Sequence, residues 1–188
     1  MFPLGFKNKH KKITSEIYQN IIERSRSKFF YLHMDIDDSF ESRFDIIILH
    51  SFIIFYFLKN FSDNERKLSQ FLFDFMFDDF DNNLREMGFG DIAVNKKMKV
   101  FITAFYGRIA NYSQGVDQIQ NNKNDDILHQ AILNNIYKGK ELDVNYIEYF
   151  KKYTLKNLDF FNSRDVKTNI DERFKFLDFS KEEKSNER

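Results

Sequence analysis

The sequence predicts an all-α protein, a single helical-bundle-like domain of about six helices. Pro3 is the only proline and glycines number six, so few residues interrupt a helix. No Asn-Gly or Asp-Gly dipeptide and no sustained apolar alternation favours a β-hairpin. Apolar residues instead recur at spacings of three and four, which is typical of amphipathic helices. The 188 residues suffice for one buried core and are too few for two ordinary domains.

The helices are predicted in order from their apolar stripes and their end signals. They span about residues 14–26, 43–59, 63–87, 94–112, 125–138 and 144–161. Thr14 or Ser15 is placed to cap the first, and Asn95 the fourth. Gly88 is expected just past the end of the third, because glycine tolerates a positive φ. Between them, residues 34–42 predict an acidic loop and residues 113–124 a polar linker.

The third predicted helix has an unusually wide apolar arc. Such a helix must lie between neighbours or keep part of this surface for a partner. The arc consists of Leu68, Phe71, Leu72, Phe73, Phe75, Phe77, Phe80, Leu84 and Met87. The fourth predicted helix gathers one clear apolar face, formed by Val94, Met98, Phe101, Ile102, Phe105, Ile109 and Tyr112.

Charge and composition limit the function. Lysine plus arginine equals aspartate plus glutamate at 29 each, so no global field attracts DNA or an anionic membrane. The absence of cysteine excludes disulfides and thiol catalysis. The longest apolar run, residues 46–58, is shorter than the ~20 residues of a membrane span.

The two ends are predicted to flank the helical domain of residues 13–179. Residues 1–12 form a basic arm, and residues 180–188 form a charged tail. A solvated arm and an arm that contacts membrane or RNA both stay open. Because lysine dominates the arm and no apolar region follows it, we expect a bacterial cytoplasmic protein, peripheral at the inner face of the inner membrane, or a matrix protein if mitochondrial.

Two places in the sequence carry residue types that could support chemistry. Asp74, Asp78 and Asp81 share one helix face, where they could hold a divalent metal or form an acid–base pair. No His-bearing metal motif accompanies them, and Asp81 is placed to pair with Arg85, so a solvated polar face is favoured. His50 lies in the apolar run, where it could ligate haem or bond a backbone carbonyl. The carbonyl is favoured because no second haem ligand is evident.

No catalytic residue, metal site or cofactor is therefore predicted. No serine or threonine lies in a Gly-flanked elbow, and Gly88-Phe89-Gly90 lacks the spacing of a phosphate-binding loop. The protein is expected to be a binding protein rather than an enzyme.

A partner-binding site is predicted where the third and fourth helices join. Lys96, Lys97 and Lys99 lie in the first turns of the fourth helix, where cations oppose the macrodipole, and an anionic partner would relieve that cost. Solvated lysines without a partner are the alternative, and they are the commoner outcome. Further along, Gly107 shares a side with Thr103 and Ala110. This small face could receive a partner helix, or it could mark a close intramolecular crossing near Tyr106, which is favoured.

Several stretches occur in an order that is more specific than any one of them. They are Ile17-Tyr18 to Arg24-Ser25-Arg26, Phe29-Phe30-Tyr31, Arg43-Phe44-Asp45, Leu49-His50, Leu72-Phe73-Asp74 to Asp81, Leu84-Arg85-Glu86-Met87-Gly88, Gly90-Asp91, Val94, and Phe105-Tyr106-Gly107-Arg108. In this order the chain resembles the ubiquinol–cytochrome c chaperone family over about residues 17–160. It departs from the family at Ile36-Asp37-Asp38, where a proline is usual.

The resemblance implies a helical chaperone that binds newly made cytochrome b and assists assembly of the ubiquinol–cytochrome c reductase (bc1) complex. In mitochondria it would act with a small helical partner, near the ribosome. We expect the apolar part of its binding surface from the Phe-rich third helix. The polar edge would consist of Arg85, Gly88, Gly90, Asp91, Lys96, Lys97, Lys99, Tyr106 and Arg108. The alternatives are a metal-dependent helical enzyme that uses the aspartate face, and a generic membrane-surface or ribosome adaptor.

Overall fold

A computed structural model describes residues 4–59, 63–121, 124–140, 143–163 and 174–178. All regular structure in these ranges is α-helical, which confirms the predicted class. The helices are α1 (Leu4–Ser25), α2 (Lys28–His33), α3 (Phe40–Leu58), α4 (Asp63–Glu86), α5 (Asp91–Gln120), α6 (Asp126–Ile136) and α7 (Val144–Ser163). The short α2 is the addition to the six predicted. None of the described helices is long and apolar enough to cross a lipid bilayer.

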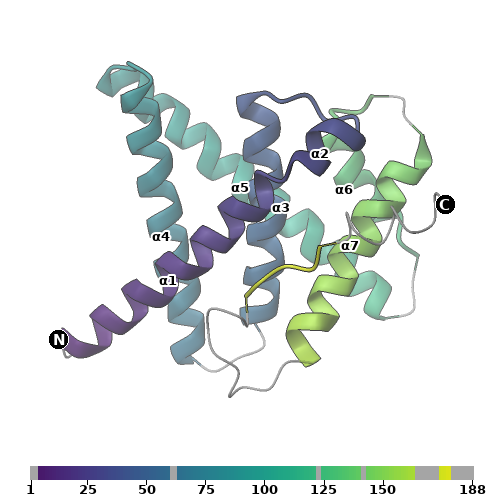
Figure 1. Cartoon of the computed structure of the whole chain (residues 1–188), viewed down its shortest axis with the longest axis horizontal. Helices are drawn as coiled ribbons and strands as arrows, with labels where there is room; N and C mark the ends of the chain where they lie inside the picture. The colour runs from purple at the N-terminus through teal and green to yellow at the C-terminus, as the bar shows by residue number, and fades with distance from the viewer. Residues whose placement is uncertain (1–3, 60–62, 122–123, 141–142, 164–173, 179–188) are drawn as a thin grey trace.

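Helix α3 is the centre of the fold, and α1, α4, α5, α6 and α7 all pack against it (Figure 1). It is apolar almost all round, as a helix surrounded by others must be. Its N-terminus is capped by Ser39, whose hydroxyl accepts the backbone N–H of Ser42 at 3.1 Å. The predicted start at Arg43 is therefore three residues late.

Helix α1 begins ten residues before the predicted cap at Thr14. Thr14 lies inside the helix and is buried, so it caps nothing. Residues 4–12 of the predicted arm are helical and continuous with the rest of α1. The residues of the predicted tail, 180–188, lie outside the described part of the chain.

Helix α4 ends as the sequence predicts. Gly88 has φ +88°, its N–H donates to the Arg85 carbonyl at 2.9 Å, and the N–H of Phe89 donates to the Leu84 carbonyl at 3.2 Å. These two bonds form a Schellman motif, which satisfies the last carbonyls of the helix. A tight joint, residues 87–90, therefore turns the chain from α4 into α5.

Helix α5 corrects the predicted fourth helix at both ends. It begins after Gly90, so Asn95 is an interior residue and not its cap. It also runs to Gln120, so the linker predicted from residue 113 is wrong over most of its length. The polar residues there face solvent, whereas Gly115 and Val116 are buried. The helix continues because its apolar face does.

The close helix crossing lies at Gly115 and not at Gly107. A Cβ on Gly115 would lie 2.7 Å from the backbone nitrogen of Leu128, so α5 and α6 touch backbone to backbone there. A Cβ on Gly107 would meet nothing within 4 Å. The predicted close approach of another helix at Gly107 is therefore wrong, and the small face of α5 is open.

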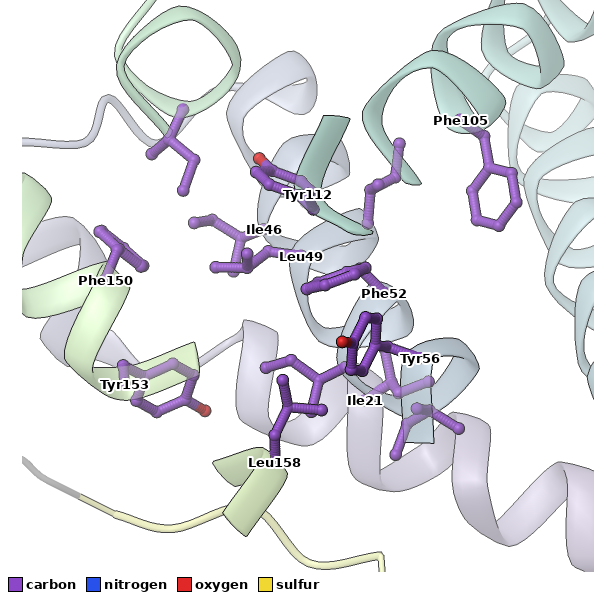
Figure 2. Packing of buried hydrophobic residues seen from close by; sticks show 14 of the residues in the cluster. Ile21, Ile46, Leu49, Phe52, Tyr56, Phe105, Tyr112, Phe150, Tyr153 and Leu158 are labelled. Carbon is purple, nitrogen blue, oxygen red and sulfur yellow. The ribbon is translucent and has the colours of Figure 1, made fainter. Parts of the chain in front are cut away.

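Aromatic rings from distant parts of the chain fill the core (Figure 2). Phe52 on α3 lies 5.3 Å from Tyr112 on α5, and Phe30 on α2 stacks on Phe150 of α7 at 5.7 Å. Residues 174–178 close the core beside α7, where the Leu177 N–H donates to Asn157 at 2.8 Å. Edge-to-face and offset ring pairs of this kind add to the free energy gained by burial.

Candidate partner-binding surface

The α4–α5 hairpin, residues 63–120, carries the predicted site. Its two helices are held together by phenylalanines: Phe73 lies 5.4 Å and Phe77 5.5 Å from the ring of Phe105. On other sides, Phe75 of α4 contacts Tyr18 of α1, and Phe80 contacts Phe44 of α3. The wide apolar arc of α4 is thus used largely within the fold, because α4 lies among three neighbours.

Exposed apolar side chains nevertheless gather on this hairpin. Six large apolar side chains are exposed among the described residues, and four of them lie on the hairpin or its joint. Ile92 is the most exposed of all, at 89%, and Val100 and Tyr106 follow it along α5. We call the set Met87, Ile92, Val100 and Tyr106, together with the exposed small residues Thr103, Gly107 and Ala110, the hairpin surface.

The joint brings four predicted residues together. Arg85 forms ion pairs with Asp81, one turn earlier on α4, and with Asp91, the first residue of α5. Gly88 and Gly90 lie between these charges, and the space around each is open. The ion pairs bridge the two helices across the turn, so the joint is clamped electrostatically as well as by its backbone bonds. In Figure 1 this end of the hairpin lies at the upper left, away from α7.

The lysines beside the joint divide into two kinds. Lys97 lies over the ring of Phe89, with its Nζ 4.7 Å from the ring centroid, which is a cation–π contact. Lys96 and Lys99 are exposed, and no acidic side chain of the described residues pairs with either. Lys96 lies at i, i+4 from Val100, and Lys99 lies at i, i+7 from Tyr106, so these residues share one side of α5. Free positive charge therefore lies within the hairpin surface, between Ile92 and Thr103 along α5.

Tyr106 lies further along α5, beyond the joint. Its ring stacks on Phe73 of α4 at 5.5 Å, and the side chain is still 56% exposed. The stacking holds the ring in one orientation at the edge of the open face around Gly107.

Arg108 is not brought to this surface. Its Nη2 lies 2.8 Å from a carboxylate oxygen of Asp45 on α3, which is 1% exposed, and Lys138 pairs with the other oxygen. Burial raises the pKa of Asp45, although both cations oppose that shift. An aspartate at the start of an apolar run needs a cationic partner. That rule predicts from the sequence that Asp45 is paired, but it does not predict which cation pairs with it.

His50 has the structural role that was favoured. It is fully buried, and its Nδ1–H donates to the Ile46 carbonyl at 2.8 Å. Nε2 then accepts the Tyr153 hydroxyl at 2.9 Å, and that hydroxyl accepts the Arg24 Nε–H at 3.1 Å. Burial lowers the pKa of His50 to about 3. Because Nδ1 carries the hydrogen, it cannot take a proton from the Ser25 hydroxyl 3.0 Å away.

The aspartate face of α4 is divided among local partners. Asp81 pairs with Arg85, as predicted, and Asp74 accepts the Gln70 amide at 2.7 Å. Within the described ranges no three His, Asp or Glu side chains converge closely enough to hold a metal ion.

Comparison with known proteins decides the family. The family model described as ubiquinol-cytochrome C chaperone matches residues 32–176, from α2 to the last described segment. The chain belongs to the ubiquinol–cytochrome c chaperone family. The stretch that matches this chaperone family includes the whole α4–α5 hairpin with its joint and its hairpin surface.

Named proteins and a solved structure resemble this chaperone-family chain. Ubiquinol-cytochrome c reductase complex assembly factor 1 is 24% identical over 162 residues in both Mus musculus and Homo sapiens. The match covers 86% of this chain, but 53% and 52% of those proteins, so the chain spans about half their length. The crystal structure of the Cbp3 homolog from Brucella abortus matches with a TM-score of 0.77 and 26% identity, covering 93% of this chain and 94% of that one.

Proposed function

We propose that this protein is an assembly chaperone of the ubiquinol–cytochrome c reductase complex, and that it binds newly made cytochrome b. The relatives named as assembly factors of that complex support the first part. One structural observation carries the second part: of the six large apolar side chains that are exposed in the described part of the chain, four lie on a single hairpin. An exposed apolar patch on an otherwise well-packed protein marks a surface that another apolar molecule covers.

The hairpin surface suits a client made of membrane helices. Transmembrane helices pack through small residues that let two backbones approach closely. Thr103, Gly107 and Ala110 give α5 such a strip, and nothing within the fold occupies the space above Gly107. A client helix laid along α5 would contact Val100 and Tyr106 on either side of this strip. Its apolar side chains would thereby be shielded from water until other subunits replace the chaperone.

The two lysines near the joint suit the charged groups at the end of such a client. Lys96 and Lys99 lie within about three turns of the joint and are free to meet anionic lipid headgroups or acidic residues that flank a membrane helix. The proposal therefore places the protein at the inner face of the bacterial inner membrane, or at the matrix face in mitochondria. A ribosome or a small helical partner would act as an additional contact. No bond is made or broken in this role, so it needs no catalytic centre.

Capture of cytochrome b during cell-free synthesis tests the proposal. The variant I92E/V100E places two charges on the hairpin surface at exposed positions, so we expect it to fold. We expect capture to fall about tenfold or more, as on loss of interface residues that dominate binding. The matched control is L32E/V144E, which changes two exposed apolar residues on α2 and α7.

Circular dichroism and thermal melting would first establish that both variants are folded. Control capture should equal that of the wild type. If I92E/V100E captures as much cytochrome b as the wild type does, the assignment of the client surface is contradicted. A loss of capture in L32E/V144E alone contradicts it as well.

A further inference from the structure

A pocket of about 210 Å³ opens between α1, α3 and α4. Its walls come from α1, α3 and α4, with one residue from α2. The apolar part of the lining consists of Ile22, Phe40, Phe44, Ile47, Phe80 and Met87. Met87 also belongs to the hairpin surface, so the pocket adjoins that surface at the joint.

Most polar groups of the pocket are engaged within the fold. The Tyr18 hydroxyl donates to Asp79 Oδ2 at 2.7 Å, and the Tyr31 hydroxyl donates to the Ser25 carbonyl at 2.8 Å. Arg43 forms a two-pronged ion pair with Asp38 outside the pocket, with Nη2 at 2.9 Å. These contacts fix the polar side chains of the rim, so the opening is shaped before anything binds.

Arg26 is different from the other charged residues of the lining. It follows directly on α1 and is exposed, and none of the described acidic residues pairs with it. Across the opening, Asp79 keeps a second carboxylate oxygen that no described donor uses, and Asn83 lies one turn further along α4. The rim therefore carries a guanidinium that can bind an anion, and oxygen atoms that can accept hydrogen bonds from N–H groups.

We propose that this pocket binds one large apolar side chain of a peptide segment from a protein partner, with an adjacent carboxylate of that segment bound by Arg26. The volume corresponds to ~7 water molecules, and it is below the range of ~300–1,000 Å³ typical of small-molecule sites. A peptide supplies what the rim requires: a carboxylate for Arg26 and backbone N–H groups for Asp79. A fatty acid would supply the anion and no donor. The inference rests on the proposed function only in taking the partner to be a protein.

Fluorescence polarisation with short, blocked, labelled peptides tests the proposal. The probe carries one phenylalanine followed by an aspartate in an alanine, serine and glutamine background, and its control has alanine in place of the phenylalanine. We expect saturable binding of the probe, and at least tenfold weaker binding of the alanine control. R26E should weaken binding of the probe about tenfold or more, since a charge-assisted contact is lost and repulsion replaces it.

A charge-swapped probe distinguishes loss of the Arg26 contact from an indirect effect of R26E on the fold. A probe with lysine in place of aspartate should bind R26E better than it binds the wild type. K152E is the matched control, because Lys152 is an exposed cation on α7, away from the pocket, and it should leave probe binding unchanged. I22W fills the pocket with a larger side chain and should abolish binding of the probe. R26E reports separately on the charged rim.

Equal binding of the phenylalanine and alanine peptides would overturn the proposal, and so would an equal loss of probe binding in K152E and R26E. Binding of anionic vesicles through Arg26, with no binding of the probe, would also overturn it. The failure of the two proposals is distinguishable. I92E/V100E leaves the pocket intact and reports on cytochrome b, whereas R26E leaves the hairpin surface intact and reports on the peptide.

Discussion

The Cβ position of Gly115 on α5 lies 2.7 Å from the backbone nitrogen of Leu128 on α6. Any side chain at residue 115 therefore has to move backbone, because the obstructing atoms belong to the main chain of α6. We expect G115A to lower the free energy of unfolding by about 1–3 kcal/mol, the usual cost of overpacking a close contact. Urea denaturation followed by circular dichroism measures it.

Gly107 provides the opposite case on the same helix. It lies in the helix interior, is exposed, and has no atom within 4 Å of its Cβ position. G107A should raise the free energy of unfolding by about 0.5–1 kcal/mol, because alanine favours the helix. Destabilisation by G107A in the same urea experiment would show that a contact within the fold does use this position.

Arg108 should matter for stability far more than Arg85. R108L leaves the buried Asp45 carboxylate with Lys138 as its one remaining cation among the described residues. We expect a loss of about 3–5 kcal/mol, as when one partner of a buried ion pair is removed. Adding D45N should recover part of this loss, because it removes the uncompensated charge. R85L removes two exposed ion pairs, which contribute little to stability, so it should leave the melting temperature nearly unchanged. Equal effects of the two leucine variants would contradict this assignment.

His50 should make stability depend on pH in the acid range. The pKa of His50 is about 3 in the folded protein, whereas its ordinary value is 6.5. Between pH 3 and pH 6.5 the imidazole is therefore protonated in the unfolded chain and neutral in the folded protein. The free energy of unfolding should therefore fall as the pH decreases below about 6.5, by up to ~1.4 kcal/mol per pH unit from this group. H50Q does not titrate, so its stability should fall less steeply over that window. Parallel curves for H50Q and the wild type would refute the assignment.

Divalent metals should not stabilise the protein. A site among Asp74, Asp78 and Asp81 would raise the melting temperature by linkage when Mg²⁺ or Zn²⁺ is added. We expect no shift, because Asp81 is paired with Arg85 and Asp74 accepts the Gln70 amide, which leaves no cluster of three carboxylates among the described residues. D74N/D78N serves as the control. A metal-dependent rise in the wild type that D74N/D78N abolishes would favour the metal-dependent enzyme instead.

Features governed by neighbouring residues were predictable from the sequence. The turn at Gly88, the pairing of Asp81 with Arg85, and the carbonyl partner of His50 all lie within one or two helical turns. The residues of the joint are also neighbours along the chain, so the structure necessarily brings them together. Local rules were sufficient for this part of the candidate site.

Features governed by distant contacts were missed. Arg108 pairs with Asp45 on another helix, and the sequence gives no sign of which arginine does so. The extension of α5 beyond residue 112 depends on α6 packing against Gly115 and Val116. The sequence does not predict the early start of α1, because Thr14, a residue type that often caps helices, lies buried within one. In each case a tertiary contact overrides a local preference.

The joint between α4 and α5 is held by two backbone hydrogen bonds and by two ion pairs of Arg85. Ile92 and Met87, on its two flanks, consequently keep a constant spacing and angle whether or not a partner is present. Docking then requires little loss of conformational entropy on the chaperone side, since the template is already set. Ordering during recognition would fall mainly on the immature chain, which adapts to a fixed shape.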